Sequence, residues 1–302
     1  MITLPRNTRD PVHVLGANGR IGQAVCRGLM AVGVKVIPVV RHEERYKATG
    51  LPMKPRMAEM LDHYSLSLAL RDAVRVIACT PPRLTLPIIA ATQSDVLLVL
   101  LGNARRYLHH ADQEGLGAME GERALLGSGR PGVMLHPTLI YGMPPPDPVR
   151  QMLRLLRSLP VLPLPGGGAA PIQPIALLDV VRCLISAVDR NWPTPAAFPI
   201  AGARPMPLVE FIRVVAEAGG VKMRPVLPIP VWMMPALSPF TVALPFLPQL
   251  SHDDLRNFAG DRSVDTRRMF TQLGINPVKL SDGLDAMLNV ATAAGEPSLQ
   301  RG

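Results

Sequence analysis

The sequence is poor in cysteine and begins without an apolar segment. Its 302 residues include three cysteines, Cys26, Cys79 and Cys183, which lie far apart without paired spacing. This scarcity excludes a disulfide framework and is typical of a reduced, cytoplasmic protein with buried thiols. The first ten residues contain no apolar core, so we expect no export signal there. We also expect no metal site.

Long basic runs are missing too, although the formal net charge is +9. The longest are the pairs Arg105-Arg106 and Arg267-Arg268, without interleaved aromatic residues. Nucleic-acid-binding surfaces gather positive charge into a stripe, so we expect a small-molecule substrate and no nucleic acid. A weak attraction to anionic membrane surfaces or to phosphorylated substrates is compatible with the same charge.

Charged residues are absent from residues 225–252, apart from His252, and the segment contains seven prolines. That many breaks exclude a membrane-spanning helix. We interpret the segment as a substrate-side cap or a homodimer contact. The alternative is a docking surface for a membrane, a lipid chain or another protein, which would make a cytoplasmic protein membrane-associated.

A glycine-rich turn directly follows the apolar residues 12–15. It reads Gly16-Ala17-Asn18-Gly19-Arg20-Ile21-Gly22. In dinucleotide-binding proteins the first glycine permits the tight turn, the second lets the backbone approach the pyrophosphate, and the third lets the helix pack against the strand. The helix N-terminus then offers free N–H groups to the anion. The sequence therefore predicts a dinucleotide site.

The residues after the turn complete a strand–helix–strand unit. Apolar residues recur every four positions from Ile21 to Leu29, Gly33 closes the predicted helix, and residues 34–40 form a second strand. Pro38 fits this strand poorly, because proline cannot donate to a ladder.

The residue that ends the second strand bears on the choice of cofactor. An acidic residue here binds the ribose 2′-hydroxyl of NAD, whereas an arginine accommodates the 2′-phosphate of NADP. The chain has Arg41 at this place, Arg20 in the turn and Arg45 nearby, which favours NADP(H) over NAD(H). The alternative is that arginine is simply frequent, since it supplies 27 of the 32 basic residues.

Strands and helices alternate through the first half of the chain. Strands are predicted at 74–79, 96–101 and 132–136, with helices at 65–73 and 120–126. Such alternation predicts an α/β fold with a doubly wound parallel sheet. The uninterrupted apolar run 96–101 is typical of a strand covered on both faces.

The composition changes after Gly142, where prolines become frequent. Helices are predicted at 149–159 and 177–188, with a loop at 164–168. We assign residues 1–142 and 172–200 to a dinucleotide-binding Rossmann domain, and residues 143–171 and 201–302 to a smaller substrate or cap domain.

Motifs in chain order resemble the extended and atypical short-chain dehydrogenase/reductases, which include the sugar-nucleotide epimerases. They are the glycine turn, His136-Pro137-Thr138-Leu139-Ile140-Tyr141-Gly142, Gln173-Pro174-Ile175-Ala176-Leu177-Leu178-Asp179-Val180, Arg262-Ser263-Val264-Asp265 and Leu273-Gly274-Ile275-Asn276-Pro277. The resemblance spans nearly the whole chain and implies a nicotinamide above the strand ends. It implies cofactor contacts from Gly16, Asn18, Gly19, Arg20, Ile21, Gly22, Arg41, Glu59, Met60, Thr80, Pro81, His136, Pro137, Thr138 and Ile140. Glu59 and Met60 would lie near the adenine, and Pro137 to Ile140 beside the nicotinamide.

The catalytic pair of that family is missing. Relatives carry a tyrosine and a lysine four residues apart on the helix before the sixth strand, and Glu114 and Ala118 stand at these positions. The serine or threonine of relatives is matched by Gly102-Asn103-Ala104. No lysine occurs between Lys54 and Lys222, so a small alignment slip does not restore it. A tyrosine without that lysine keeps a pKa near about 10 and is a poor base at neutral pH.

Other groups must act if the chain is an enzyme. Asn103 could hold a substrate carbonyl, while Tyr107, His109 or His110 could supply a proton. Glu114 could serve as an acid if it is buried. The alternative is an ordinary polar surface loop after the fifth strand.

Two functions stay open at this stage. One is an NADP(H)-dependent oxidoreductase or epimerase-like enzyme with a non-standard active site, acting on a keto or hydroxyl group of a sugar nucleotide or a hydrophobic molecule. The other is a redox-inactive, NADPH-binding structural or regulatory protein, which would resemble the accessory subunit of respiratory complex I.

Overall fold

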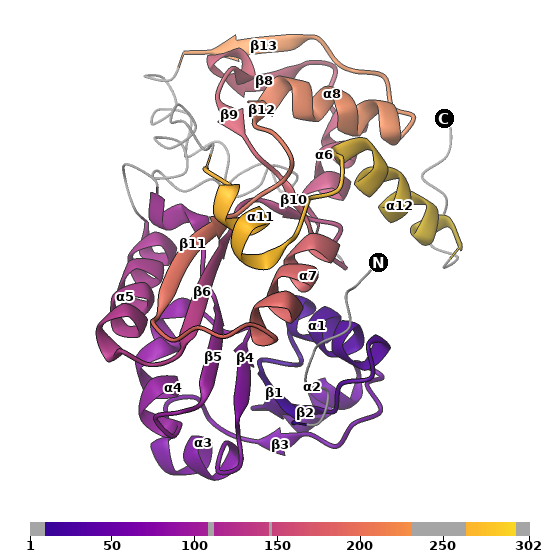
Figure 1. Cartoon of the computed structure of the whole chain (residues 1–302). Coiled ribbons are helices and arrows are strands. Elements are labelled where there is room, and N and C mark those ends of the chain that lie inside the picture. Colours follow the sequence, from indigo (N-terminus) through magenta and orange to yellow (C-terminus); the bar gives the residue numbers. More distant parts are fainter. Residues whose placement is uncertain (1–9, 108–111, 145–146, 231–263, 294–302) are drawn as a thin grey trace.

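A seven-stranded parallel sheet forms the centre of the larger part of the molecule (Figure 1). The computed structural model describes residues 10–107, 112–144, 147–230 and 264–293. The sheet has the order β11-β6-β5-β4-β1-β2-β3 and every neighbouring pair is parallel. Its strands are β1 (Val12–Leu15), β2 (Val36–Val40), β3 (Arg56–Met57), β4 (Arg75–Ala78), β5 (Leu97–Leu101), β6 (Gly132–Pro137) and β11 (Ala196–Ile200). The predicted doubly wound α/β fold is confirmed.

Helices cover both faces of this sheet. One face packs against α1 (Arg20–Ala31), α7 (Leu177–Val188) and α11 (Arg267–Leu273), and the other against α3 (His63–Ala69), α4 (Thr85–Ala91) and α5 (Gln113–Ser128). Strand residues alternate between the two apolar cores, as Val76 and Ile77 do in β4. Such alternation is what a strand buried on both faces requires.

Pro38 lies inside β2, opposite Val14. The carbonyls of Lys35 and Val39 accept hydrogen bonds from Val12 and Gly16, at the two ends of β1. Because successive residues of a strand direct their backbone groups to opposite neighbours, the backbone of Pro38 faces the β3 side. There β3 pairs with β2 only from Val39 onward. The missing N–H of Pro38 therefore leaves no ladder bond unmade, which explains why proline is tolerated.

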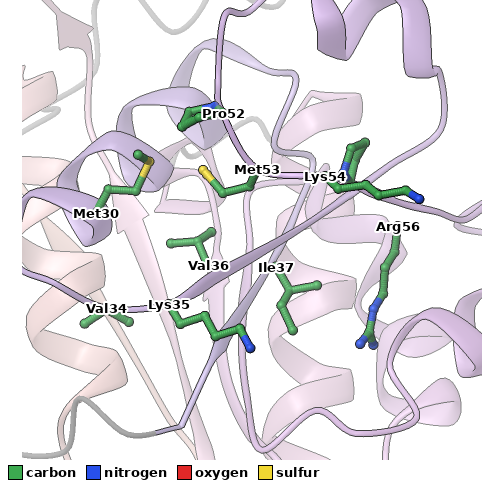
Figure 2. Close-up of a pocket in the computed structure, with 10 residues that line it drawn as sticks. Met30, Val34, Lys35, Val36, Ile37, Pro52, Met53, Lys54 and Arg56 are labelled. Atoms are coloured by element: carbon green, nitrogen blue, oxygen red, sulfur yellow. The ribbon is translucent and has the colours of Figure 1, made fainter.

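An open hollow of about 620 Å³ lies beside β2 (Figure 2). Its lining includes Met30, Val36 and Met53, with Lys35 and Lys54 among the charged residues. It lies by the beginning of β2, whereas the glycine turn follows the end of β1. The lining contains none of the residues predicted to hold the cofactor.

A smaller part of the chain has its own apolar core. It contains α6 (Pro148–Ser158), α8 (Leu208–Ala218), α12 (Leu280–Ala293) and the paired short strands β8 (Leu162–Pro165) with β13 (Val226–Ile229), β9 (Pro171–Ile172) with β12 (Met206–Pro207), and β7 (Ile140–Tyr141) with β10 (Ile175–Ala176). The core includes Leu153, Phe211 and Leu284. The residue boundaries between the two predicted domains stay a prediction.

Some predicted elements differ in their bounds. The helix predicted at 120–126 is part of α5, which runs from Gln113 to Ser128. Its first part was not predicted, because glycines at 115 and 117 weaken the helical pattern there. The loop predicted at 164–168 is partly strand, since β8 pairs with β13 and only Gly166–Gly168 forms a short 3-10 turn. The helix predicted at 65–73 is α3, which runs from His63 to Ala69.

The uncharged segment 225–252 is described only to Pro230, and the rest of it lies outside the described residues. Its beginning forms β13, which pairs with β8 in the smaller part. Among the described helices, none has the length and apolar character to cross a membrane. The interpretation of this segment as a cap, dimer contact or docking surface stays a prediction.

Candidate functional site

The glycine turn has a geometry that only glycine permits. Gly16 has a φ of 73°, and a Cβ there would lie 2.7 Å from the carbonyl oxygen of Cys79. A Cβ on Gly22 would lie 2.2 Å from the carbonyl oxygen of Gly16, and one on Gly19 would lie 3.2 Å from the same atom. The turn, the neighbouring strand β4 and the first turn of α1 are therefore packed so closely that side chains are excluded at the first and third glycine.

The N-terminus of α1 has two features of an anion site. Gly19 is its N-cap residue and provides no side-chain cap, and the first turn contains no acidic residue. Gln23 donates from its amide to the carbonyl of Asn18 over 3.0 Å, which holds the turn in place. The first N–H groups of a helix and its dipole together attract an anion.

A cavity of about 920 Å³ extends from this turn along the ends of β4, β5 and β6. This volume lies within the range of small-molecule and cofactor sites. The structure brings together eight of the predicted cofactor residues in its lining: Gly19, Arg20, Ile21, Thr80, Pro81, Pro137, Thr138 and Ile140. The predicted catalytic residues Asn103 and Tyr107 also line it, as does Glu114.

The residues predicted to hold the adenine half lie outside this lining. Arg41 directly follows β2, and its Nε lies 3.8 Å from Oε2 of Glu59. Arg41 also donates to Nε2 of His42, and the backbone N–H of Met60 donates to the Glu59 carboxylate. Arg41 and Glu59 are both exposed, so a ligand can reach them, but an acidic group already neighbours the arginine.

His136 lies behind the cavity rather than in its lining. The side chain is fully buried, and Nε2 lies 2.8 Å from Oε2 of Glu122 on α5. The backbone N–H of Asn103 donates to Nδ1 over 3.1 Å. A Cβ on Gly102 would lie 2.3 Å from Nδ1, so glycine at the end of β5 gives the imidazole its space. His136 thus contacts the wall of the cavity from inside the protein.

Asn103 is held by four hydrogen-bonding groups at the end of β5. Besides the backbone contact to His136, its side-chain Oδ1 accepts from the N–H of Arg105 over 3.0 Å, and its Nδ2 donates to Oε2 of Glu114 over 3.0 Å. Its carbonyl accepts from the N–H of Arg106. The amide is oriented, yet Nδ2 keeps a second N–H and Oδ1 a second lone pair for a ligand.

Tyr107 stands beside the same group of residues. Its ring meets the edge of the His136 ring at 5.6 Å, and the Arg106 guanidinium lies 4.7 Å from its centroid. Burial raises the pKa of Tyr107, and the Glu122 carboxylate raises it further, against the opposing effect of Arg106. The phenol therefore stays protonated at neutral pH and can donate a proton or a hydrogen bond, but it is a poor base.

The α5 face toward the cavity has no lysine. Glu114 and Gly117 line the cavity, while Ala118 is buried. A Cβ on Gly121 would lie 2.3 Å from the carbonyl oxygen of Pro82, so the short 3-10 turn η1 (Pro82–Leu84) packs directly on the helix. The position matching the family's lysine is thus covered by protein.

Sequence reasoning missed two groups. Glu122 pairs with His136 and with Arg106, whose Nε lies 2.8 Å from its Oε2. Arg83 lines the cavity, and within the described ranges its guanidinium forms no ion pair or hydrogen bond. Arg83 could have been found from its place shortly after a predicted strand, where ligand-binding residues gather. No local sequence pattern distinguishes Glu122. Tyr141 is buried in the smaller core rather than in the lining, and His109 and His110 lie outside the described residues.

No protein-family model matches the sequence, and no curated protein matches it. Solved structures share its fold at low identity. A nucleoside-diphosphate-sugar epimerase from Pseudomonas aeruginosa is 19% identical with a TM-score of 0.69, over 95% of this chain and 99% of that chain. UDP-glucuronic acid 4-epimerase from Bacillus cereus, in complex with UDP-glucuronic acid and NAD, is 15% identical with a TM-score of 0.68, over 94% and 99%.

A third similar structure is a short-chain dehydrogenase/reductase superfamily protein from Agrobacterium tumefaciens with bound NAD. It is 14% identical with a TM-score of 0.66, over 95% of this chain and 100% of that chain. At these identities the likeness concerns the fold, and it extends over nearly all of each protein. The chain therefore has the full-length fold that sugar-nucleotide epimerases and short-chain dehydrogenase/reductases share.

Proposed function

We propose that the chain is a nicotinamide-dinucleotide-binding protein of the short-chain dehydrogenase/reductase type that oxidises or reduces a hydroxyl or keto group. The observation that carries this proposal is the glycine turn, where added Cβ atoms on Gly16 and Gly22 would meet backbone atoms at 2.7 and 2.2 Å. A turn so closely packed, opening onto an uncapped helix N-terminus, suits a pyrophosphate. The resemblance in motif order and the shared fold support the same assignment.

The cofactor, when bound, supplies hydride transfer, so the chain's own groups need to orient the substrate and stabilise its oxygen. Asn103 lines the cavity, and its amide is held in one orientation by Glu114 and by the N–H of Arg105, which leaves one N–H of Nδ2 for a ligand. A preoriented donor of this kind stabilises a developing negative charge on a substrate oxygen. Tyr107, protonated at neutral pH, is the proposed proton donor.

Turnover with matched variants tests this proposal. We expect the full chain to consume NADPH with a member of a panel of keto sugars and long-chain ketones. Asn103→Ala is expected to lower kcat by about a hundredfold, the effect of removing one oxyanion donor. Tyr107→Phe is expected to lower kcat with little change in NADPH affinity, because it removes only the hydroxyl. Turnover of no substrate by a chain that binds NADPH would contradict the enzyme assignment.

A redox-inactive binding protein is the second candidate. The observation that favours it is the α5 face, where Ala118 is buried and Glu114 is bonded to Asn103, so neither family catalytic group is present. In that case the dinucleotide would stabilise the fold by binding linkage. NADPH would then raise the melting temperature of the chain without being consumed with any substrate.

The choice of NADP(H) over NAD(H) rests on Arg41 and carries a specific prediction. Arg41→Ala is expected to weaken NADPH binding about tenfold and to leave NADH nearly unchanged, since only the 2′-phosphate meets the guanidinium. Glu59→Gln is expected to strengthen NADPH binding, because it removes the carboxylate 3.8 Å from that guanidinium. Isothermal titration of the wild type and of both variants with each dinucleotide measures these affinities. Equal effects of Arg41→Ala on NADPH and NADH would refute the phosphate contact.

A further inference from the structure

A buried pair of ionisable residues lies behind the cavity wall without touching the cavity. His136 is fully buried, Glu122 is buried on α5, and neither is part of the lining. Nε2 of the imidazole lies beside the Glu122 carboxylate, and Nδ1 lies beside both the backbone N–H and the carbonyl oxygen of Asn103. These contacts join α5 to the residues after β5 through His136, near the end of β6.

The surroundings of the imidazole favour one tautomer. Nε2 lies 2.8 Å from a carboxylate oxygen of Glu122, so a proton on Nε2 avoids two lone pairs in contact. Nδ1 lies 3.1 Å from the backbone nitrogen of Asn103, whose N–H donates to it, and 3.3 Å from the carbonyl oxygen of the same residue. Because a backbone N–H can only donate, we assign the neutral Nε2–H tautomer, in which Nδ1 accepts.

The loop after β5 depends on this acceptor through Asn103. The N–H groups of Arg105 and Arg106 donate to Oδ1 and to the carbonyl of Asn103, so both bonds follow the position of that residue. The side chain of Asn103 also reaches Glu114 over 3.0 Å. A continuous series of contacts therefore runs from Glu122 through His136 and Asn103 to Glu114, with both carboxylates on α5.

The ionisable groups that face His136 come from two elements. Glu122 approaches from α5, while Arg106 and Tyr107 approach from the turn η2 (Ala104–Tyr107). Arg106 Nε and His136 Nε2 each lie 2.8 Å from the same carboxylate oxygen, so the guanidinium compensates the Glu122 charge inside the protein. The ring of Tyr107 rests on the edge of the imidazole at 5.6 Å.

We propose that His136 and Glu122 are a positioning pair, in which the unprotonated Nδ1 fixes the Asn103 backbone and thereby aims the Asn103 amide and the Tyr107 ring into the cavity. A catalytic consequence of orienting Asn103 and Tyr107 rests on the proposed function, whereas the fixing of the Asn103 backbone by His136 does not. Neither residue touches the cavity, so both act through other residues and are not catalytic themselves.

Hydrogen exchange of the amides in residues 102–106 tests the hold directly. His136→Leu fills the imidazole's volume without an acceptor, whereas His136→Asn places an amide oxygen close to the position of Nδ1. We expect exchange in 102–106 to rise about tenfold in His136→Leu, the size expected for one lost buried hydrogen bond, and to be largely restored in His136→Asn. His13→Leu, the same change at another fully buried histidine of the sheet, is the matched control and is expected to leave 102–106 unchanged.

If His136 only fills space, the exchange rates of the two variants should have the opposite order. Leucine would then preserve the protection of 102–106 better than the smaller asparagine, and this result would overturn the proposal. Equal exchange in both variants and the wild type would overturn it as well. Glu122→Gln, which keeps an acceptor for Nε2–H, is expected to change exchange less than His136→Leu does.

Binding probes separate this proposal from the proposed function. We expect His136→Leu to weaken the binding of NADPH, whose nicotinamide half would lie at the end of β5, more than the binding of adenosine 2′,5′-bisphosphate, which lacks this half. If the wild type binds neither probe, the proposed function fails, and the exchange order still decides the role of His136. An equal loss of affinity for both probes would contradict the proposal that His136 orients the residues of the cavity.

Discussion

Replacing Gly22 by alanine is expected to abolish tight dinucleotide binding. The new Cβ would lie 2.2 Å from the carbonyl oxygen of Gly16 and 2.9 Å from the Cα of Ala17, both backbone atoms. The helix must therefore move away from the turn, which takes its free N–H groups out of position. Losing two charge-assisted hydrogen bonds corresponds to about a hundredfold or more in affinity for NADPH.

Stability should fall along with binding in this variant. Forcing a methyl group into a closely packed site costs about 1–3 kcal/mol in the free energy of unfolding. The matched control is Gly127→Ala, on α5, where an added Cβ meets no atom within 4 Å. That change is expected to raise stability by about 0.5–1 kcal/mol and to leave NADPH affinity unchanged. Unaltered NADPH binding in Gly22→Ala would contradict the assignment of the turn.

Asp147 is expected to give the largest loss of stability among single polar side chains near the site. Its carboxylate is 1% exposed and accepts four backbone N–H groups. Oδ1 caps α6 through Val149 and Arg150, and Oδ2 accepts from Gly142 and Met143 at 2.8 and 3.0 Å. One side chain therefore joins the start of α6 to the backbone just after β7.

Asp147→Ala is expected to lower the free energy of unfolding by about 3–4 kcal/mol. About 1 kcal/mol comes from the lost helix cap, and the rest comes from buried N–H groups left unpaired. Because Met143 lines the cavity, NADPH affinity should fall as well. Asp62→Ala removes an exposed cap that accepts only from Tyr64 and Ser65, and is expected to cost about 1 kcal/mol. Denaturant unfolding compares the two, and equal losses would show that the bonds to Gly142 and Met143 carry no stability.

The parts of the fold with a local signal could be predicted from the sequence. The glycine turn, the strands after it and the doubly wound parallel sheet follow from apolar runs, from the alternation of strands and helices and from where glycine must stand, and the structure has them. The first part of α5 could not be predicted well, because Gly115 and Gly117 lower helix propensity there. The close packing at Gly121, where an added Cβ would lie 2.3 Å from the carbonyl oxygen of Pro82, was not predictable either, because a packing partner distant in sequence leaves no local pattern.

The candidate site divides in the same way. Residues that follow strand ends were predictable, since parallel strands bring their carboxyl ends to one edge, and Thr80, Asn103 and Pro137 all line the cavity. The placement of His136 was not predictable, because its burial depends on Glu122 and on the missing side chain of Gly102. The preference for NADP(H) stays a prediction, and Glu59 beside Arg41 is a feature that the strand pattern alone did not reveal.

A crystal structure of the full chain grown with NADPH tests the central claim most directly. The account predicts the pyrophosphate against the N–H groups that begin α1 at Gly19, and the nicotinamide in the cavity between Asn103 and the segment from Pro137 to Ile140. A dinucleotide bound in another place, or no bound dinucleotide at millimolar NADPH, would contradict it.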